Sequence, residues 1–195
     1  DDMWDLWSKK PDEEAFPQSL RNQFAVLSKW SPHIEPGHWP DADMLPLGYL
    51  GPRPGWGSAR QSRLTLGEAR TLVTLWSIAR SPLILGTNLT RMDEQIEALV
   101  TNPEVIGVDQ RSTGNRPVIE TADSVIWTAI EDGVHLVAVF NLRDAPASIT
   151  EPWMRLGLDK TSYRVRDLWQ REDVGTQPSL LVRVPAHGAV LLGLK

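Results

Sequence analysis

The 195-residue sequence contains no cysteine, which excludes disulfides and thiolate metal sites. Its compartment is therefore not fixed, and secretion or a periplasmic location stays open. No apolar run approaches the roughly 20 residues that a membrane-spanning helix needs, so we expect no membrane partner. The chain carries 20 Lys and Arg against 25 Asp and Glu, a net charge of −5. A nucleic-acid partner is not expected either, because such surfaces need clustered positive charge.

Motifs for bound groups are also missing. The sequence has no glycine-rich phosphate loop and no G-x-S-x-G elbow. His33 and His38 are five residues apart, and Pro32 and Pro36 forbid the helix on which such a pair would bind zinc. We therefore expect no metal and no cofactor.

Tryptophan, in contrast, is abundant: the chain has nine Trp against two Tyr and three Phe. Indole rings stack well on the apolar faces of sugars, so this excess favours a carbohydrate site, although most individual Trp residues are expected in the core. The opening DDMWDLW sets two of them among Asp1, Asp2 and Asp5. A solvated tail rarely contains indoles, so this segment is expected to form the wall of a cleft, within a longer protein.

The first 110 residues alternate between helix and strand patterns. An apolar stripe predicts a helix over 12–31, with Pro17 in its first turn. A capping box of Thr65 and Glu68 predicts a helix that Pro82 stops. The buried face of this helix is expected to consist of Leu72, Leu75, Trp76 and Ala79. A short apolar strand of Leu83, Ile84 and Leu85 is expected next. A further helix is expected to start at Thr90 with Asp93 and to end near Asn102.

Short apolar strands that alternate with helices are typical of a parallel sheet, either doubly wound or a (β/α)₈ barrel. Since a whole barrel takes about 250 residues, 110 cannot close one. After Gly114 the pattern changes to about six to eight short strands, with a hairpin signal at 131–133. We therefore predict two domains: 1–110, the last βα units of an incomplete barrel, and 116–195, an antiparallel β-sandwich.

Two carboxylates, Asp41 and Asp43, follow the segment GHW. Their spacing puts both on one side of an extended strand, at the end where barrels carry their functional residues. The alternative is that Asp41 caps the following loop and Asp43 pairs with Arg60 or Arg63, and spacing does not decide between the two. Opposed to the N-terminal aspartates, they would form the carboxylate pair that glycoside hydrolysis requires.

Several segments in order resemble glycoside hydrolase family 27, the α-galactosidase family. PGHWPDADML resembles the family motif PGGWNDPDML, and LTLGEARTLVTLWSIARSPLILGTNL is similar to the family's helix, turn and eighth strand. NPEVIGVDQ is similar to the linker before the family's sandwich, and DDMWDLW to R-x-x-x-D-x-x-D-x-W entered after its arginine. The resemblance covers residues 1–115, with looser matches at YRVRDLW and HGAVLLGL.

The resemblance implies roles for individual residues. Asp2 matches the general acid/base. The other matching positions are Asp5 and Trp7, fixed in the same motif; Asp43 and Met44, lining the sugar pocket; and Trp39 and Asp41, in the loop that supports them. The family's nucleophile, in a K-x-D strand end, has no counterpart here, nor has the arginine before Asp2. We therefore expect the C-terminal portion of such an enzyme, inactive alone.

The expected function is that of a retaining exo-glycosidase fragment, which hydrolyses terminal α-D-galactosides and whose partner is the carbohydrate substrate. His38, Pro40 and Ala42 depart from the family motif, so other sugars stay open: α-N-acetylgalactosaminides, β-L-arabinopyranosides and α-glucans. A non-catalytic carbohydrate-binding module is the alternative from another class. Against it, Trp127, Trp153 and Trp169 lie in alternating runs that favour the core.

Overall fold

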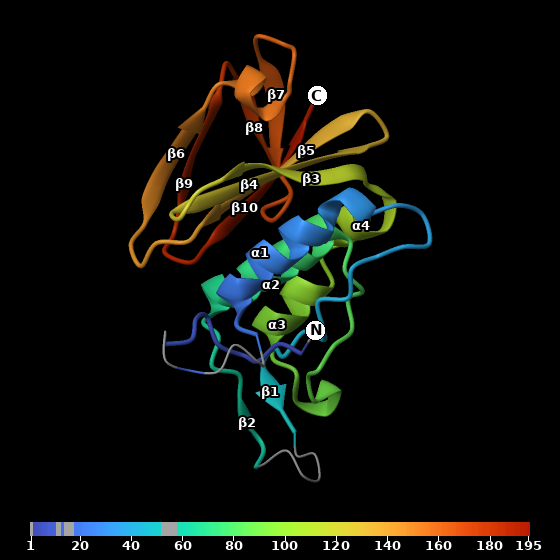
Figure 1. Cartoon of the computed structure of the whole chain (residues 1–195), viewed down its shortest axis with the longest axis vertical. Helices are drawn as coiled ribbons and strands as arrows, with labels where there is room; N and C mark the ends of the chain where they lie inside the picture. Colours follow the sequence, from blue (N-terminus) through green and yellow to red (C-terminus); the bar gives the residue numbers. More distant parts are fainter. Residues whose placement is uncertain (1, 11–12, 14–17, 52–57) are drawn as a thin grey trace.

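The computed structural model describes residues 2–10, 13, 18–51 and 58–195. A layer of helices lies between an antiparallel sandwich and a small hairpin at the opposite end of the molecule (Figure 1). The helical elements are α1 (Leu20–Trp30), η1 (Ser31–His33), α2 (Leu66–Ala79), η2 (Leu89–Arg91), α3 (Glu94–Val100), α4 (Pro103–Arg111) and η3 (Trp153–Leu156). The strands are β1 (Tyr49–Leu50), β2 (Arg60–Gln61), β3 (Thr113–Glu120), β4 (Ser124–Glu131), β5 (Val134–Asn141), β6 (Ala147–Glu151), β7 (Tyr163–Asp167), β8 (Glu172–Gln177), β9 (Leu180–Val184) and β10 (Ala189–Leu194).

Helix α1 begins later than the sequence predicted. Ser19 has an extended backbone and its side chain accepts a hydrogen bond from the Asn22 amide, so it is the N-cap and Leu20 the first helical residue. The expected place of Pro17 in the first turn lies outside the described residues. The apolar stripe also ends early, because Leu27 is buried whereas Trp30 is 51% exposed.

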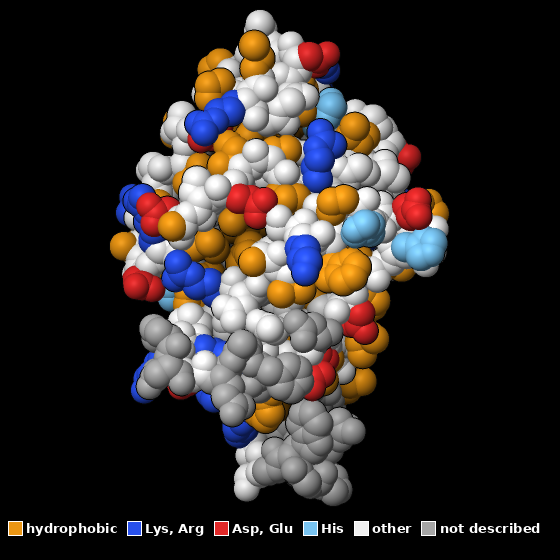
Figure 2. All heavy atoms as spheres, viewed as in Figure 1, with side chains coloured by type: hydrophobic (Ala, Val, Ile, Leu, Met, Phe, Trp, Pro, Cys, Tyr) orange, Lys and Arg blue, Asp and Glu red, His pale blue; other side chains and the backbone are white. Residues whose placement is uncertain are grey.

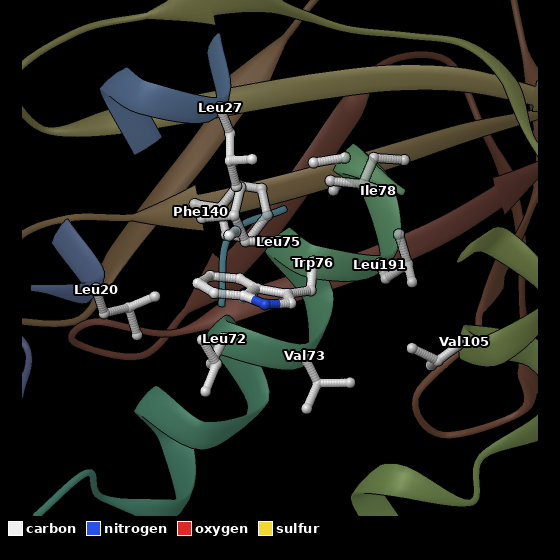
Figure 3. Close-up of a cluster of buried hydrophobic side chains, with 14 of the residues drawn as sticks. Leu20, Leu27, Leu72, Val73, Leu75, Trp76, Ile78, Val105, Phe140 and Leu191 are labelled. Carbon is white, nitrogen blue, oxygen red and sulfur yellow. The ribbon is translucent and has the colours of Figure 1, made fainter. Parts of the chain in front are cut away.

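Helix α2 confirms its predicted cap but not its predicted single buried face. Thr65 and Glu68 form the capping box, and the helix ends at Arg80, whose φ of 56° is left-handed. From Leu72 to Ala79 every side chain is buried, since α1, α3, α4 and the sandwich sheet surround the helix. Figure 3 shows Trp76 at the centre of this cluster, between Leu72 and Phe140.

The N-terminal part of the chain contains two isolated parallel β-bridges. Leu45 pairs in parallel with Leu85, and Met3 with Gln18. The predicted strand at 83–85 is thus reduced to one bridge, and Ile84 is 60% exposed. The direction of pairing is that of βα units, in which consecutive strands run the same way.

Two predictions near residues 88–111 are wrong in detail. Thr90 does not start the next helix: it lies in η2, and Asp93 alone caps α3 by accepting a hydrogen bond from the Ile96 amide. The segment expected to be a linker forms helix α4. Asn102 explains this, because its side chain accepts hydrogen bonds from the amides of Glu104 and Val105.

The C-terminal part is an antiparallel sandwich, as predicted. Its larger sheet has the strand order β3-β4-β5-β10-β7-β8, and the smaller pairs β6 with β9. The hairpin signal is confirmed, since Asp132 (φ 48°) and Gly133 (φ 78°) form the turn between β4 and β5. Both outer pairs of the larger sheet, β3 with β4 and β7 with β8, contain register shifts.

The larger sheet is covered on both faces. Trp127, Phe140 and Leu191 belong to a core cluster that also contains α1, α2 and the N-terminal Met3 and Trp7. The alternate residues of the same strands pack instead against the smaller sheet, in a cluster of Ile126, Val137, Val139, Trp153, Tyr163 and Leu192. One hydrophobic core therefore joins the helices to the sandwich.

Arg80 fixes the C-terminal end of α4. Its guanidinium donates hydrogen bonds to the carbonyls of Asp109, Gln110 and Ser112 at 2.7, 2.9 and 2.8 Å, and lies 3.9 Å from the ring centre of Trp39. Beside it, Oδ1 of Asp109 is buried without a hydrogen-bond partner among the described residues. Burial raises the pKa of Asp109 to about 6, against the opposing effect of the Arg80 charge.

Charged side chains of both signs are interspersed on the face drawn in Figure 2. In the part of the chain that the structure describes, no helix has the length and apolar character needed to cross a bilayer.

Phe140→Ala should lower the free energy of unfolding by about 3–5 kcal/mol, because the ring is fully buried and packs edge-on against Phe24. Urea titration followed by circular dichroism measures the change. Met154→Ala, at an 82% exposed apolar residue, is the control and should stay within about 0.5 kcal/mol. Equal effects of the two variants would contradict the shared core.

Asp109→Asn should become more stabilising, relative to wild type, as the pH rises from 4 to 7. The folded carboxyl, with its pKa of about 6, keeps a proton that the unfolded chain releases near pH 4, so wild-type stability falls over this window. Urea titrations at unit steps of pH test this. Asp123→Asn is the control: the Arg143 hydrogen bond lowers the pKa of Asp123, so this carboxyl titrates below the window and the effect of its substitution should change little from pH 5 to 7. A pH-independent effect of Asp109→Asn would be evidence against the buried, partnerless carboxyl.

Candidate active site

Four of the predicted site residues lie around one pocket of about 440 Å³. The N-terminal segment contributes Asp2 and Asp5, and the segment after Ala42 contributes Asp43 and Met44. Residues 85–87 complete the wall, so the pocket lies where the parallel-paired segments around Leu45 and Leu85 end. This is the functional end of parallel βα units.

The predicted Trp39 and Asp41 do not line this pocket. They flank a separate groove with Trp30 on the α1 side. A larger pocket, of about 610 Å³, lies between α4 and the sandwich, but several of its charged groups already form ion pairs, such as Arg166 with Glu104. The smaller pocket is the candidate site, because the predicted carboxylates meet there.

Asp43 has a constrained backbone and a carboxylate held by main-chain amides. Its φ of 82° is left-handed, which breaks the alternation of an extended strand. Oδ2 accepts a hydrogen bond from the Met3 amide at 2.7 Å, and Oδ1 from the Met44 amide at 2.6 Å. The Trp76 indole N–H donates to the Asp43 carbonyl at 2.8 Å, so the core of α2 helps to hold this conformation.

Asp41 supports Asp43 rather than facing the same way. Oδ1 of Asp41 accepts a hydrogen bond from the Asp43 amide at 2.9 Å. The loop-capping alternative for Asp41 is therefore confirmed. The proposed pairing of Asp43 with Arg60 or Arg63 is wrong, because both arginines bind Asp5.

Asp5 anchors the N-terminal segment to the segment around β2. Its side chain is almost fully buried and accepts hydrogen bonds from the guanidinium groups of Arg60 and Arg63 and from the Arg63 amide at 2.8 Å. Burial alone would raise the pKa of Asp5, but these hydrogen bonds outweigh it and lower the pKa to about 2. Asp5 is thus ionised, with both oxygens occupied by the protein.

The Asp2 side chain is exposed at the rim of the pocket. Its carboxylate makes no hydrogen bond or ion pair that is described within residues 2–10, 13, 18–51 and 58–195. The backbone is fixed, since the Asp2 carbonyl accepts a hydrogen bond from the Gln18 amide at 2.7 Å and the next amide, of Met3, donates to Asp43. A carboxylate on a fixed backbone can exchange a proton with a molecule in the pocket.

Sequence reasoning missed three supports of the site. A Cβ at Gly86 would lie 2.6 Å from Sδ of Met44, so any larger residue there would force the Met44 side chain to move. Pairing of Arg60 with Asp43 was one of two open alternatives, and its pairing with Asp5 was not predicted. His187, to which the sequence assigned no functional role, stacks on Trp7. In the sequence, the only signal at this position was the dipeptide His187-Gly188 at the start of HGAVLLGL, which indicates a turn.

None of the described residues forms a group of three or more His, Asp and Glu that could hold a metal ion.

Two family models match the chain. Residues 18–111 match the model for α-galactosidase A, and residues 121–194 match the α-galactosidase C-terminal β-sandwich domain. α-Galactosidase 3 of Arabidopsis thaliana is 32% identical over 161 residues, which is 78% of this chain and 34% of that protein. The chain thus spans about a third of the length of this curated relative.

Solved structures match over the whole chain. A family 27 β-L-arabinopyranosidase from Geobacillus stearothermophilus has a TM-score of 0.89 at 38% identity, over 100% of this chain and 43% of its own. A Bacillus halodurans protein described as a candidate α-N-acetylgalactosaminidase has a TM-score of 0.85 at 33% identity, over 100% and 46%.

The motifs of the pocket, both family models and these structures agree: the chain belongs to glycoside hydrolase family 27, the α-galactosidase family, and matches the C-terminal portion of its members, with the end of the (β/α)₈ barrel followed by the β-sandwich.

Proposed function

We propose that this chain supplies the general acid/base and part of the sugar pocket of a retaining exo-glycosidase that acts on terminal α-D-galactosides. The observation that carries the proposal is the hydrogen bond from the Met3 amide to Asp43 Oδ2. It links segments 40 residues apart and sets the free Asp2 carboxylate beside a second carboxylate in one pocket.

Asp2 is the proton donor in this proposal. It protonates the oxygen of the leaving group as the glycosidic bond breaks, and then, as a carboxylate, takes a proton from the attacking water. Its exposure and its lack of a described protein partner suit both steps.

Asp43 and Met44 form the sugar-binding wall. Each oxygen of Asp43 accepts one backbone N–H, and a carboxylate oxygen has a further lone pair for a sugar hydroxyl. Met44 offers an apolar surface beside it. Trp39 and Asp41 act from behind this wall, through the Asp41 hydrogen bond to the Asp43 amide. Asp5, saturated by arginines, holds the segment in place rather than binding sugar.

Retaining hydrolysis needs a second carboxylate as the nucleophile. In the described pocket, Asp43 and Asp5 already have their oxygens engaged. We therefore propose that the nucleophile comes from barrel residues outside these 195. In this division residues 1–110 are the last βα units of the catalytic barrel, and residues 116–195 are the sandwich.

The names of the relatives suggest the substrate class. A β-L-arabinopyranoside has the ring configuration of an α-D-galactoside without its C6 hydroxymethyl group. It is therefore the second candidate, supported by the 38% identical neighbour of that activity. A carbohydrate-binding module built on the sandwich is not supported, because Trp127 and Trp153 are buried and cannot stack on a sugar.

In the full-length protein, Asp2→Ala should nearly abolish kcat/KM on a galactose disaccharide, while largely sparing it on a dinitrophenyl α-galactoside. A sugar alcohol needs a proton to leave, and a positioned acid contributes about 10²–10⁴-fold, whereas dinitrophenolate leaves without one. Steady-state kinetics on both substrates measure the difference. Azide needs no general base, so it should restore turnover and give a galactosyl azide of retained α configuration. Glu172→Gln, at an exposed carboxylate of β8, is the control and should leave both activities unchanged. Equal losses on both substrates, or no rescue, would assign the role elsewhere.

Asp43→Asn should weaken the binding of substrate and of free galactose together. One side-chain oxygen becomes an NH₂ that faces an amide donor, and the negative charge that accepts sugar hydroxyls is lost. We expect KM and the inhibition constant of galactose to rise by about tenfold or more, from a cost of 1–3 kcal/mol. A fall in kcat with unchanged galactose affinity would refute the assignment.

A further inference from the structure

We propose that His187, in the sandwich, is a positioning residue for the segment that carries Asp2, so that the sandwich helps to set the geometry of the active site. The inference rests on the proposed role of Asp2. It starts from the contacts that this imidazole makes with both parts of the chain.

His187 is held from three directions. Its ring stacks on the indole of Trp7, with 4.1 Å between ring centres and 15° between planes. Nδ1 is 2.8 Å from Oε1 of Glu68 in α2, and Nε2 is 2.8 Å from Oδ1 of Asp144. The Thr71 hydroxyl also donates to the His187 carbonyl at 2.6 Å. A ring with both nitrogens bonded and one face covered has little rotational freedom left.

Glu68 makes this contact while it caps α2. Its other oxygen, Oε2, accepts hydrogen bonds from the amide and the hydroxyl of Thr65. The carboxylate is thus fixed by the helix end, and the imidazole by the carboxylate. His187 therefore occupies a place set by the core of the barrel part, although it belongs to the turn between β9 and β10.

Trp7 depends on stacking for its position. Its indole nitrogen is buried and has no hydrogen-bond partner among the described residues. Its described ring contacts include the stack on His187 and an edge contact with Phe24, at 6.5 Å between ring centres, and its carbonyl accepts a hydrogen bond from the Arg21 amide. Removal of the imidazole would take away the stacking partner and leave a gap on that face of the ring.

Trp7 in turn belongs to a strip with alternating sides. Met3, Asp5 and Trp7 point inward, with exposures of 3%, 1% and 8%. Asp2 and Trp4 lie on the exposed side, at the same pocket to which Met3 and Asp5 also contribute. The inward residues are held in turn by Asp43, by Arg60 and Arg63, and by His187. Loosening one inward anchor lets the strip tilt and misaligns the carboxylate that it presents.

The test uses the full-length protein and the variant His187→Asn. Asparagine tolerates the left-handed backbone at this position (φ 52°) but cannot both stack and reach two carboxylates. The control, Asp144→Ala, removes one contact of the same ring from a side chain that is 93% exposed. Both are assayed on a galactose disaccharide and on a dinitrophenyl α-galactoside, with amide hydrogen exchange of residues 3–7 measured in parallel.

For His187→Asn we expect a loss of kcat/KM about tenfold larger on the disaccharide than on the aryl galactoside, since only the former needs an aligned acid. Exchange at residues 3–7 should speed up, while Asp144→Ala stays within about twofold of wild type in all measurements. Equal losses on both substrates, or unchanged exchange, would overturn the inference. A wild-type protein that hydrolyses no galactoside would overturn the proposed function instead, and the exchange measurement alone would then decide whether His187 holds the segment.

Discussion

The burial of helix α2 on all sides is the constraint on which the other parts of the molecule depend. Trp76 is inside the core and still donates its indole N–H to the Asp43 carbonyl. Just beyond the helix, the Ser81 hydroxyl accepts a hydrogen bond from the Ala42 amide at 3.0 Å. The helix and the residue after its C-cap therefore hold the segment 42–43 by two hydrogen bonds, and any shift of α2 would move Asp43 with it.

The two ends of α2 also bind other parts of the molecule. At its start Glu68 reaches His187 in the sandwich, and at its end Arg80 binds the last carbonyls of α4. Trp169 adds a third link, since its indole N–H donates to the Thr74 hydroxyl at 3.0 Å. The sandwich is thus attached along the length of one helix, which supports treating the two parts as one mechanical unit.

Several local signals in the sequence were read correctly, whereas most of the individual long-range partners were not. The capping box at Thr65 and the hairpin at Asp132 depend on neighbouring residues, so their patterns are visible in the chain. Asp41 and Asp43 were expected on one side of an extended strand, but only Asp43 lines the pocket, because its left-handed φ breaks the period of two. The partners of Asp5 lie more than 50 residues away, and no spacing rule reaches that far. The expectation that most Trp residues belong to the core is met by Trp76, Trp127 and Trp153, which are buried.

The register shifts in the outer strands of the larger sheet have a consequence for association. β3 carries Pro117, which has no N–H to donate, and its pairing with β4 shifts twice. At the opposite margin β8 is exposed along most of its length, presents Glu172 and Asp173, and is paired with a shift beside Val165. Irregular, charged margins discourage edge-to-edge aggregation with strands of other molecules. Both outer strands of the larger sheet thus carry features that oppose pairing with a strand of another molecule.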